Sequence, residues 1–119
     1  NHDCLRFTGF TSFPEWRLFN GAHQERVAVK GALTANDGES LLAAARESVG
    51  ILGAGEWLMS RDLAEGRLVR VLPEWQLDDQ GGIYLVRPSA KFSPATTLAF
   101  KEWIERTFAN GPPWALAQL

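Results

Sequence analysis

Apolar and polar positions alternate near the start of the chain. This period of two runs over residues 4–8 and predicts a half-buried strand. Two further short strands are predicted over residues 16–19 and 26–31. Asn20 and Gly21 lie between them, and this pair is a strong signal for a β-hairpin because it accepts positive backbone φ angles. The first part of the chain is therefore predicted to be mainly β-structure.

The middle of the chain shows helical spacing. Residues 33–37 lead out of the preceding strand into a helix, which Asn36 is expected to cap by accepting hydrogen bonds from its first turn. Glu39 resembles the reciprocal half of a capping box. The predicted apolar stripe of this helix comprises Leu41, Leu42, Ala45 and Val49.

The segments that follow alternate between strand and helix. Residues 49–54 are predicted as a buried strand, and residues 57–65 as a short helix or turn that ends at Gly66. Residues 68–72 and 83–87 are predicted as two more strands.

A final amphipathic helix is predicted over residues 94–109. Ser93 is expected to cap it, and Pro94 to occupy its first position, where the missing N–H has no cost. Asn110 and Gly111 end it. Its apolar stripe comprises Phe100, Trp103, Ile104 and Phe108. Strands that alternate with helices predict an α/β fold. The hairpin adds an antiparallel pair, so we expect a mixed, largely parallel sheet flanked by helices.

Composition narrows the possible functions. The chain has 119 residues and a formal net charge of −2, and its twelve lysines and arginines are scattered. Non-specific DNA binding needs a basic surface, so this chain by itself is not expected to bind nucleic acid. No apolar run approaches the ~18 residues of a membrane span. A single cysteine, Cys4, excludes an internal disulfide and is typical of a reducing, cytoplasmic location.

Catalysis and cofactor binding find little support in the sequence. The only histidines are His2 and His23, and no third group is placed to orient a cysteine–histidine pair. The spacings typical of a metal site are absent. Gly53 and Gly55 follow a predicted strand but lack the third glycine of a dinucleotide-binding motif. We therefore expect no enzyme activity, no metal and no cofactor.

A candidate binding site follows from the predicted topology. Ligands of open α/β sheets bind beyond the carboxyl ends of the strands, near helix N-termini, which suit anions. The loop at residues 9–14 and the helix entry at 34–37 should meet there. The predicted site comprises Phe10, Thr11, Ser12, Thr34 and Asn36. Asp37 would repel an anion unless it turns away. The alternative is that Asn36 is only a helix cap and Thr11 and Ser12 only loop residues.

A family resemblance adds to these inferences. Residues 65–75, then 83–88 with their terminal proline, then Ser93 and Pro94 opening a helix, closely resemble the C-terminal end of a LysR-type transcriptional regulator, in its effector-sensing domain. Residues 30–37 and 43–51 resemble the helix entry and the following passage of that domain's distal lobe. The chain departs from the family's usual glycine at Ser48 and usual proline at Gly55. Both positions are expected near the cleft.

The resemblance implies two α/β lobes like those of type 2 periplasmic binding proteins. Residues 1–88 would be the distal lobe, with 83–87 as a strand that crosses between lobes. Residues 89–119 would be a C-terminal helix and tail returning to the proximal lobe. Most of that lobe and the winged helix-turn-helix DNA-binding domain would lie outside this chain.

The function that the resemblance implies is effector sensing and oligomerisation. A small metabolite, often a carboxylate or other anion in such proteins, would bind between the lobes. The alternative is an oligomer-assembly module that binds no ligand. In either case the apolar stripe of the last helix should drive self-association of this chain or dock onto its own sheet.

Overall fold

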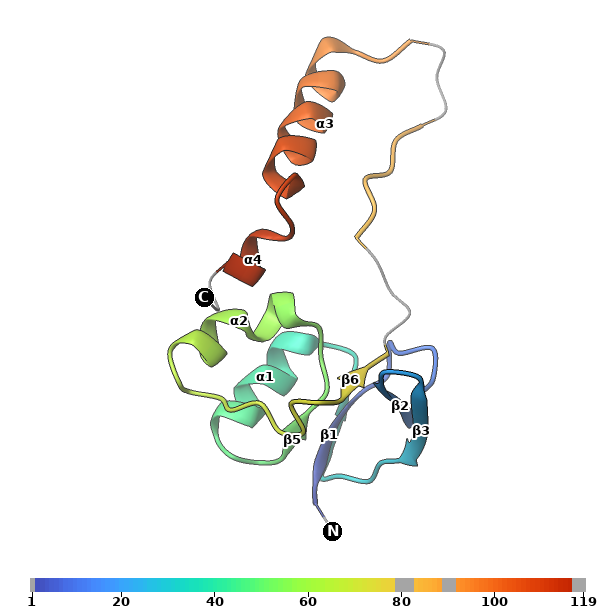
Figure 1. The fold of residues 1–119 in the computed structure, drawn as a ribbon, viewed down its shortest axis with the longest axis vertical. Coiled ribbons are helices and arrows are strands. Elements are labelled where there is room, and N and C mark those ends of the chain that lie inside the picture. The colour runs from blue at the N-terminus through green and yellow to red at the C-terminus, as the bar shows by residue number, and fades with distance from the viewer. Residues whose placement is uncertain (1, 79–82, 89–91, 117–119) are drawn as a thin grey trace.

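Two small sheets and a pair of helices form a body, and a long C-terminal helix stands away from it (Figure 1). The computed structural model describes residues 2–78, 83–88 and 92–116, and the remaining residues (1, 79–82, 89–91 and 117–119) are not described. The molecule measures 55 × 32 × 30 Å along its principal axes. Parts of the predicted 89–119 segment, namely 89–91 and 117–119, lie outside the described residues.

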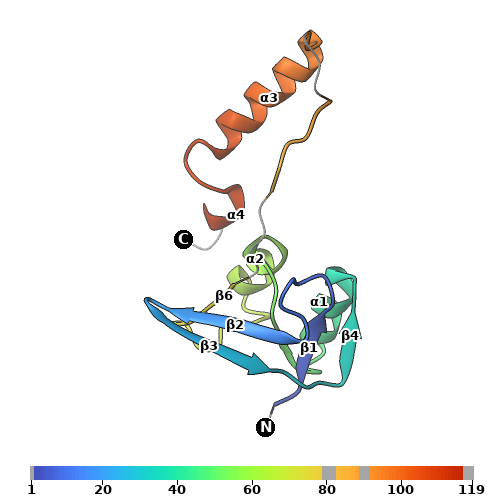
Figure 2. The ribbon, with the colours of Figure 1, turned by 90° about the vertical axis from the view of Figure 1, so that its right-hand side faces the viewer.

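The first sheet is parallel and has three strands in the order β4-β1-β5, formed by Leu33–Ala35, Cys4–Phe7 and Ile51–Leu52. Leu5 is its centre, because it is in register with Leu33 on one side and Leu52 on the other. Helix α1 (Gly38–Arg46) covers one face of this sheet (Figure 2). Leu5, Leu41 and Ala45 are buried there and form the core.

The second sheet is antiparallel and has three strands in the order β3-β2-β6, formed by His23–Ala28, Glu15–Asn20 and Gln76–Leu77. The predicted hairpin is confirmed. Asn20 pairs with His23, so the turn itself is Gly21 and Ala22, and Gly21 has the positive φ of 58° that such a turn requires. The mixed α/β fold is therefore confirmed, with the parallel and antiparallel pairs in separate sheets. Strands β4 and β6 were not predicted.

A buried carboxylate joins the two helices of the body. Helix α2 (Glu56–Ala64) carries Asp62, whose side chain is 1% exposed. Arg46, the last residue of α1, donates from Nε to Oδ1 at 2.8 Å and from Nη2 to Oδ2 at 2.9 Å. Arg67 donates from Nε to Oδ1 at 2.6 Å. The backbone oxygen of Asp62 also accepts from the N–H groups of Arg67 and Leu68. One residue therefore holds α1, α2 and the turn after α2 together.

Two predicted strands are wrong. Residues 68–72 and 83–87 have no strand partner in the described part of the chain and run as irregular or extended backbone. Val69 is 81% exposed and Val86 84% exposed. Both segments have the apolar composition of strands, but a strand also needs a neighbouring strand for its N–H and C=O groups, and here none lies beside them.

The helix caps at two positions differ from prediction. The last long helix, α3 (Ala95–Phe108), is preceded by Pro94 and has no side-chain cap. Ser93 is therefore not the cap, and its hydroxyl instead accepts a hydrogen bond from Arg87. The predicted helix end near Gly111 is confirmed, since Gly111 has a φ of 94°.

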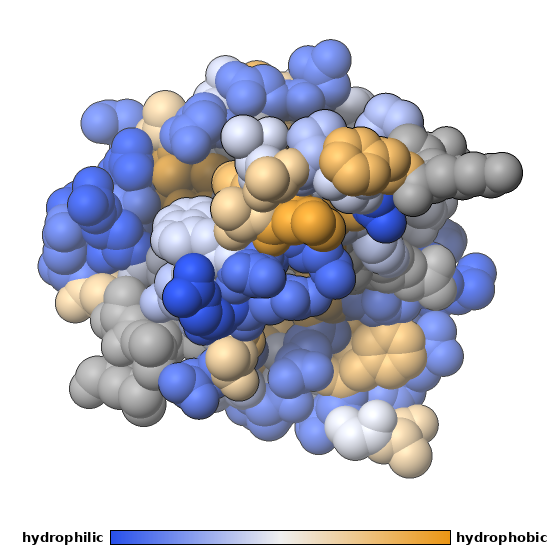
Figure 3. All heavy atoms as spheres, turned by 90° about the horizontal axis from the view of Figure 1, so that it is seen from above, coloured by the Kyte–Doolittle hydropathy of each residue, from blue (hydrophilic) through white to orange (hydrophobic). Residues whose placement is uncertain are grey.

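The apolar side chains of helix α3 are exposed to solvent or only partly buried. None of its residues is buried, and Leu98, Phe100 and Trp103 are each about half exposed. Hydrophobic side chains are visible on the end of the molecule seen in Figure 3. A short helix, α4 (Pro113–Leu116), packs against α2. Docking of α3 onto the chain's own sheet is therefore not what the structure shows.

The end of α1 corrects the expected position of Ser48. Val49 lies beyond the helix and is 40% exposed, so it is not part of the buried stripe, whereas Leu41, Leu42 and Ala45 are buried as predicted. Ser48 has a φ of 61°, the left-handed conformation that a helix end commonly assigns to glycine. It precedes β5 and so lies at the amino edge of the parallel sheet, away from the candidate site.

Replacing Asp62 with asparagine should destabilise the body strongly. The amide keeps the shape but removes the charge that Arg46 and Arg67 surround, so the free energy of unfolding should fall by about 3 kcal/mol. Urea unfolding followed by circular dichroism would measure this. Glu74→Gln, an exposed change of the same kind, is the matched control and should have little effect.

The loss of stability in Asp62→Asn should depend on pH. Hydrogen bonds from Arg46 and then Arg67 hold the pKa of Asp62 well below its usual range. A lowered pKa in the folded state means that the stabilisation is complete above the ordinary carboxyl pKa and is lost as the pH falls below it. The stability gap between wild type and Asp62→Asn should therefore be larger at about pH 7 than at about pH 2. An equal gap at both would contradict the role assigned to this ion pair.

Candidate functional site

The carboxyl ends of β1 and β4 bring the two predicted binding segments to one edge. Phe7 is in register with Ala35 as the two strands end. The N–H of Thr8 continues the ladder by donating to the Ala35 carbonyl at 3.0 Å. The loop at residues 8–14 therefore leaves the sheet beside the entry to α1, as the sequence predicted.

Aromatic packing shapes the start of this loop. The rings of Phe7 and Phe10 meet edge to face, with centroids 5.4 Å apart. Gly9 lies over the Phe7 ring, and a Cβ atom there would come within 2.4 Å of it. A larger residue at this position would require the Phe7 ring to move. Phe10 thus packs on the end of β1, which places the rest of the loop at the sheet edge.

The backbone of the loop is held by hydrogen bonds, whereas, among the described residues, the side-chain hydroxyls of Thr11 and Ser12 are not. Turn hydrogen bonds run from the Phe13 N–H to the Phe10 carbonyl at 3.1 Å and from the Glu15 N–H to the Ser12 carbonyl at 2.8 Å. Thr11 is exposed and Ser12 is half-buried. Within the described part of the chain neither hydroxyl makes a hydrogen bond. Both are therefore available to a ligand.

Asp37, and not Asn36, caps α1. The Asp37 carboxylate accepts from the N–H groups of Glu39 at 3.3 Å and Ser40 at 3.2 Å, and from the Ser40 hydroxyl at 2.6 Å. The bond from the Ser40 hydroxyl, followed by those from the two backbone groups, lowers the pKa of Asp37. The Asn36 cap is therefore a wrong prediction. Asn36 is exposed and, among the described residues, its side chain has no partner.

This cap changes what the start of α1 can bind. A free helix N-terminus attracts anions through its unpaired N–H groups and positive dipole end. Here a carboxylate of the chain already occupies those groups. An external anion would have to displace Asp37, so any charge recognition at this edge must come from a side chain.

Arg6 is the side chain that the sequence analysis missed. It is in register with Thr34, so both project from the face of the sheet opposite to Leu5. Its Cζ atom lies 5.9 Å from the centre of the Phe13 ring. Its Nε atom is buried and has no hydrogen-bond acceptor in the described part of the chain. The alternation of residues 4–8 places Arg6 on the polar face of the strand, and that pattern was the available signal.

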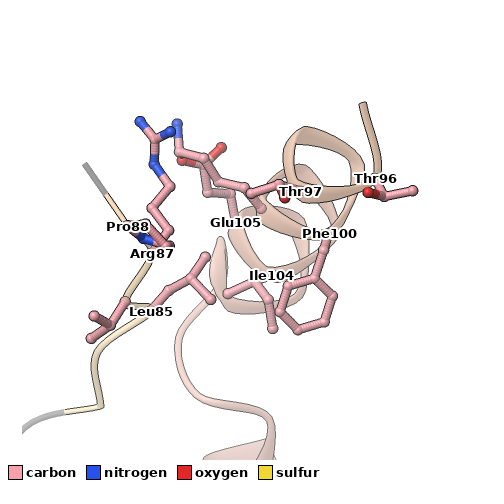
Figure 4. A pocket seen from close by; sticks show the side chains of 10 residues that line it. Leu85, Arg87, Pro88, Thr96, Thr97, Phe100, Ile104 and Glu105 are labelled. Atoms are coloured by element: carbon pink, nitrogen blue, oxygen red, sulfur yellow. The ribbon is translucent and has the colours of Figure 1, made fainter. Parts of the chain in front are cut away.

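A hollow formed by described residues lies elsewhere. It has a volume of about 640 Å³ and runs between residues 85–88 and α3. Leu85 and Ile104 point toward one another in it, with Phe100 alongside (Figure 4). None of the five predicted site residues lines it. The predicted site is thus an open edge, formed by loop 8–14, Thr34 and Asn36.

The described residues offer little support for a reactive cysteine, a metal site or a membrane-spanning helix. Burial raises the pKa of the Cys4 thiol, and the charge of Asp3 adds to the rise, so its reactive thiolate is disfavoured. Among the described residues no three histidine, cysteine or acidic side chains gather as a metal site. No helix in the described ranges is long and apolar enough to span a bilayer.

The fold matches that of a regulatory domain of known structure. The regulatory domain of AphB from Vibrio vulnificus, treated with cumene hydroperoxide, aligns with 88% of this chain at a TM-score of 0.67 and 20% identity. The alignment covers 51% of that chain. At this identity the resemblance shows an α/β fold of the same kind, and nothing beyond the fold.

Sequence comparison then identifies the family. The LysR substrate binding domain family matches residues 1–109, and the chain belongs to this family of transcriptional regulators. The regulator PtxR of Pseudomonas aeruginosa is 35% identical over 103 residues, which are 87% of this chain and 32% of that protein. The activator TtdR of Escherichia coli O6:K15:H31 is 45% identical over 76 residues, 62% of this chain and 24% of that protein. The chain thus spans at most about a third of these relatives.

The cap assignment can be tested with two alanine variants. Asp37→Ala removes the acceptor of the first-turn N–H groups, so its melting temperature should fall by a few degrees. Asn36→Ala removes no contact among the described residues and should leave the melting temperature unchanged. Thermal unfolding followed by circular dichroism measures both. A larger effect from Asn36→Ala than from Asp37→Ala would restore the original assignment.

Proposed function

We propose that this chain is the effector-sensing and oligomerisation region of a LysR-type transcriptional regulator. A small metabolite, with an anion as the favoured class, binds at the carboxyl edge of the parallel sheet. The observation that carries the proposal is the register of β1 with β4, which sets loop 8–14 beside Thr34 and Asn36. The family match over residues 1–109 supports it.

In this proposal the chain supplies only part of a larger protein. Residues 1–88 form the distal lobe, and residues 89–119 return to a proximal lobe that the rest of the regulator completes. The winged helix-turn-helix DNA-binding domain also lies in that rest. The relatives PtxR and TtdR are much longer than this chain, which supports such a division.

Signal transmission follows from differential affinity. The effector bridges the open edge of this lobe and the second lobe, and binds one arrangement of lobes and subunits better than another. It therefore shifts the population toward that arrangement and changes how paired DNA-binding domains meet an operator. No covalent step is involved.

A panel of metabolites against the two-lobed protein tests the proposal. Calorimetry should give a saturable heat of binding, with one ligand per protein, for at least one metabolite. If no metabolite in a broad panel gives heat, the assembly-only alternative is favoured. Asn36→Asp should weaken an anionic effector, because it places a second carboxylate beside Asp37, while the melting temperature changes little. Asn20→Asp, the same change at the hairpin, is the matched control.

Unchanged affinity in Asn36→Asp would remove Asn36 from the site. It would leave the rest of the proposal to be judged by the panel itself, because the loop hydroxyls do not depend on Asn36.

The assembly-only alternative has one observation in its favour. The apolar side chains of residues 83–86 and of α3 are largely exposed in the described structure, and surfaces of this kind mark contact sites. Oligomerisation also belongs to the main proposal, so exposure by itself does not separate the two. The ligand panel does.

Self-association of this chain is expected to involve α3. Trp103→Ser should lower the apparent mass in light scattering, because it removes an apolar side chain that is 54% exposed on α3. Trp57→Ser, on α2 and 58% exposed, is the control and should leave the mass unchanged. A chain that is monomeric at all concentrations would contradict this prediction.

A further inference from the structure

Arg6 carries a buried donor without an acceptor. Its Nε atom is inaccessible to solvent and has no hydrogen-bond partner among the residues that the structure describes. Buried N–H groups are almost always paired, so an exception calls for an explanation. Arg46 shows how this chain satisfies such a group, since its Nε and Nη2 atoms both donate to one carboxylate. Arg6 has no such carboxylate within the described residues.

The guanidinium of Arg6 extends toward the candidate site. Its Cζ atom lies 5.9 Å from the ring centre of Phe13, which belongs to the loop that follows β1. Thr34, on the neighbouring strand, is in register with Arg6 and shares its face of the sheet. A cation, an aromatic face and a hydroxyl are therefore arranged where β1 and β4 end.

Two acidic residues at the borders of the candidate site, one at the end of the loop and one at the start of α1, make other contacts. Glu15, at the end of the loop, lies 4.0 Å from the guanidinium of Arg26. Asp37 accepts from the first turn of α1 and from the Ser40 hydroxyl. The charge of Arg6 is thus not neutralised by an ion pair among the described residues.

We propose that Arg6 is the anchor for an oxyanion, most simply a carboxylate, of the ligand that binds at this edge. The inference rests on the proposed function and names the charge of its ligand. A carboxylate matches the planar fork of a guanidinium. Because the Nε atom of Arg6 is closed to solvent, the ligand would accept hydrogen bonds from the terminal Nη atoms. The Thr34 hydroxyl supplies a neutral donor beside it.

The arrangement also explains how an anion binds beside a capped helix. Because Asp37 occupies the start of α1, the helix dipole is not available, and the positive charge has to come from a side chain. The Phe13 ring faces the guanidinium and fixes its direction through a cation–π contact. Arg6 therefore supplies charge that the helix start cannot.

Nitrogen-15 spectroscopy of arginine side chains tests the anchor directly on this chain. Sodium acetate is titrated against sodium chloride at constant ionic strength, which holds general screening fixed. The Nε–H resonance of Arg6 should shift in a saturable way. Arg17 is the internal control, because its Nε is also buried without a partner but lies on the antiparallel sheet. Its resonance should not shift.

Variants extend the test to the two-lobed protein and to any effector that the panel identifies. Arg6→Gln should weaken binding by at least about tenfold, as loss of a charge-assisted hydrogen bond predicts. Arg6→Lys keeps the charge but loses the fork, so it should bind between wild type and Arg6→Gln. Arg17→Gln should bind like wild type. If the Arg6 variants do not fold, the titration of the wild-type chain decides by itself.

The outcomes separate this inference from the proposed function. An effector that binds equally well to wild type and Arg6→Gln overturns the anchor and leaves effector sensing intact. No shift of the Arg6 resonance, or an equal shift of Arg17, also overturns it. A third outcome is saturable acetate binding at Arg6 with no heat of binding for any metabolite in the panel. It would support Arg6 as an oxyanion anchor and overturn effector sensing.

Discussion

The body of this structure depends on a single buried carboxylate. Asp62 is almost completely inaccessible, and two guanidinium groups from different segments close over it. Removing a carboxylate from water is costly, and only the paired, hydrogen-bonded geometry makes it tolerable. That requirement fixes the distance between the end of α1 and the last turn of α2. It also orders the turn after α2, which sets Leu68 against the core.

The position of the candidate site follows from the same frame. Helix α1 covers the face of the parallel sheet that carries Leu5, and its start is held at the carboxyl edge beside the end of β1. Because Asp37 satisfies the first turn, the edge is polar but not intrinsically positive. In the proposed site the cation is supplied by Arg6, on the opposite face of β1. The two faces of β1 therefore have different roles. One face packs in the core through Leu5, and the other carries Arg6 at the candidate site.

In the C-terminal part, a segment with strand-like sequence has no strand partner among the described residues, and an amphipathic helix has its apolar face partly exposed. Residues 83–88 have the composition of a strand, yet their backbone has no partner among the described residues. Helix α3 forms because its hydrogen bonds are internal, but its apolar face stays open. Ser93 does not cap it and instead binds Arg87, a link between the two segments.

The sequence by itself determined the local elements and the family. The period of residues 4–8, the hairpin at Asn20 and Gly21, the buried stripe of Leu41 and Ala45, and the end of α2 at Gly66 were all predicted, because they depend on neighbours along the chain. So was the meeting of the loop at residues 9–14 with the helix entry, since parallel strands end at a common edge. The five predicted site residues remain a prediction.

Tertiary structure decided the rest. Asp37 caps α1 in place of Asn36 because the backbone turns one residue later than the pattern indicated. Strands 68–72 and 83–87 fail for lack of a partner, which no local pattern can show. The burial of Asp62 and the unpaired Nε of Arg6 depend on contacts between segments far apart in sequence. Charge pairing across such distances is set only when the chain is folded.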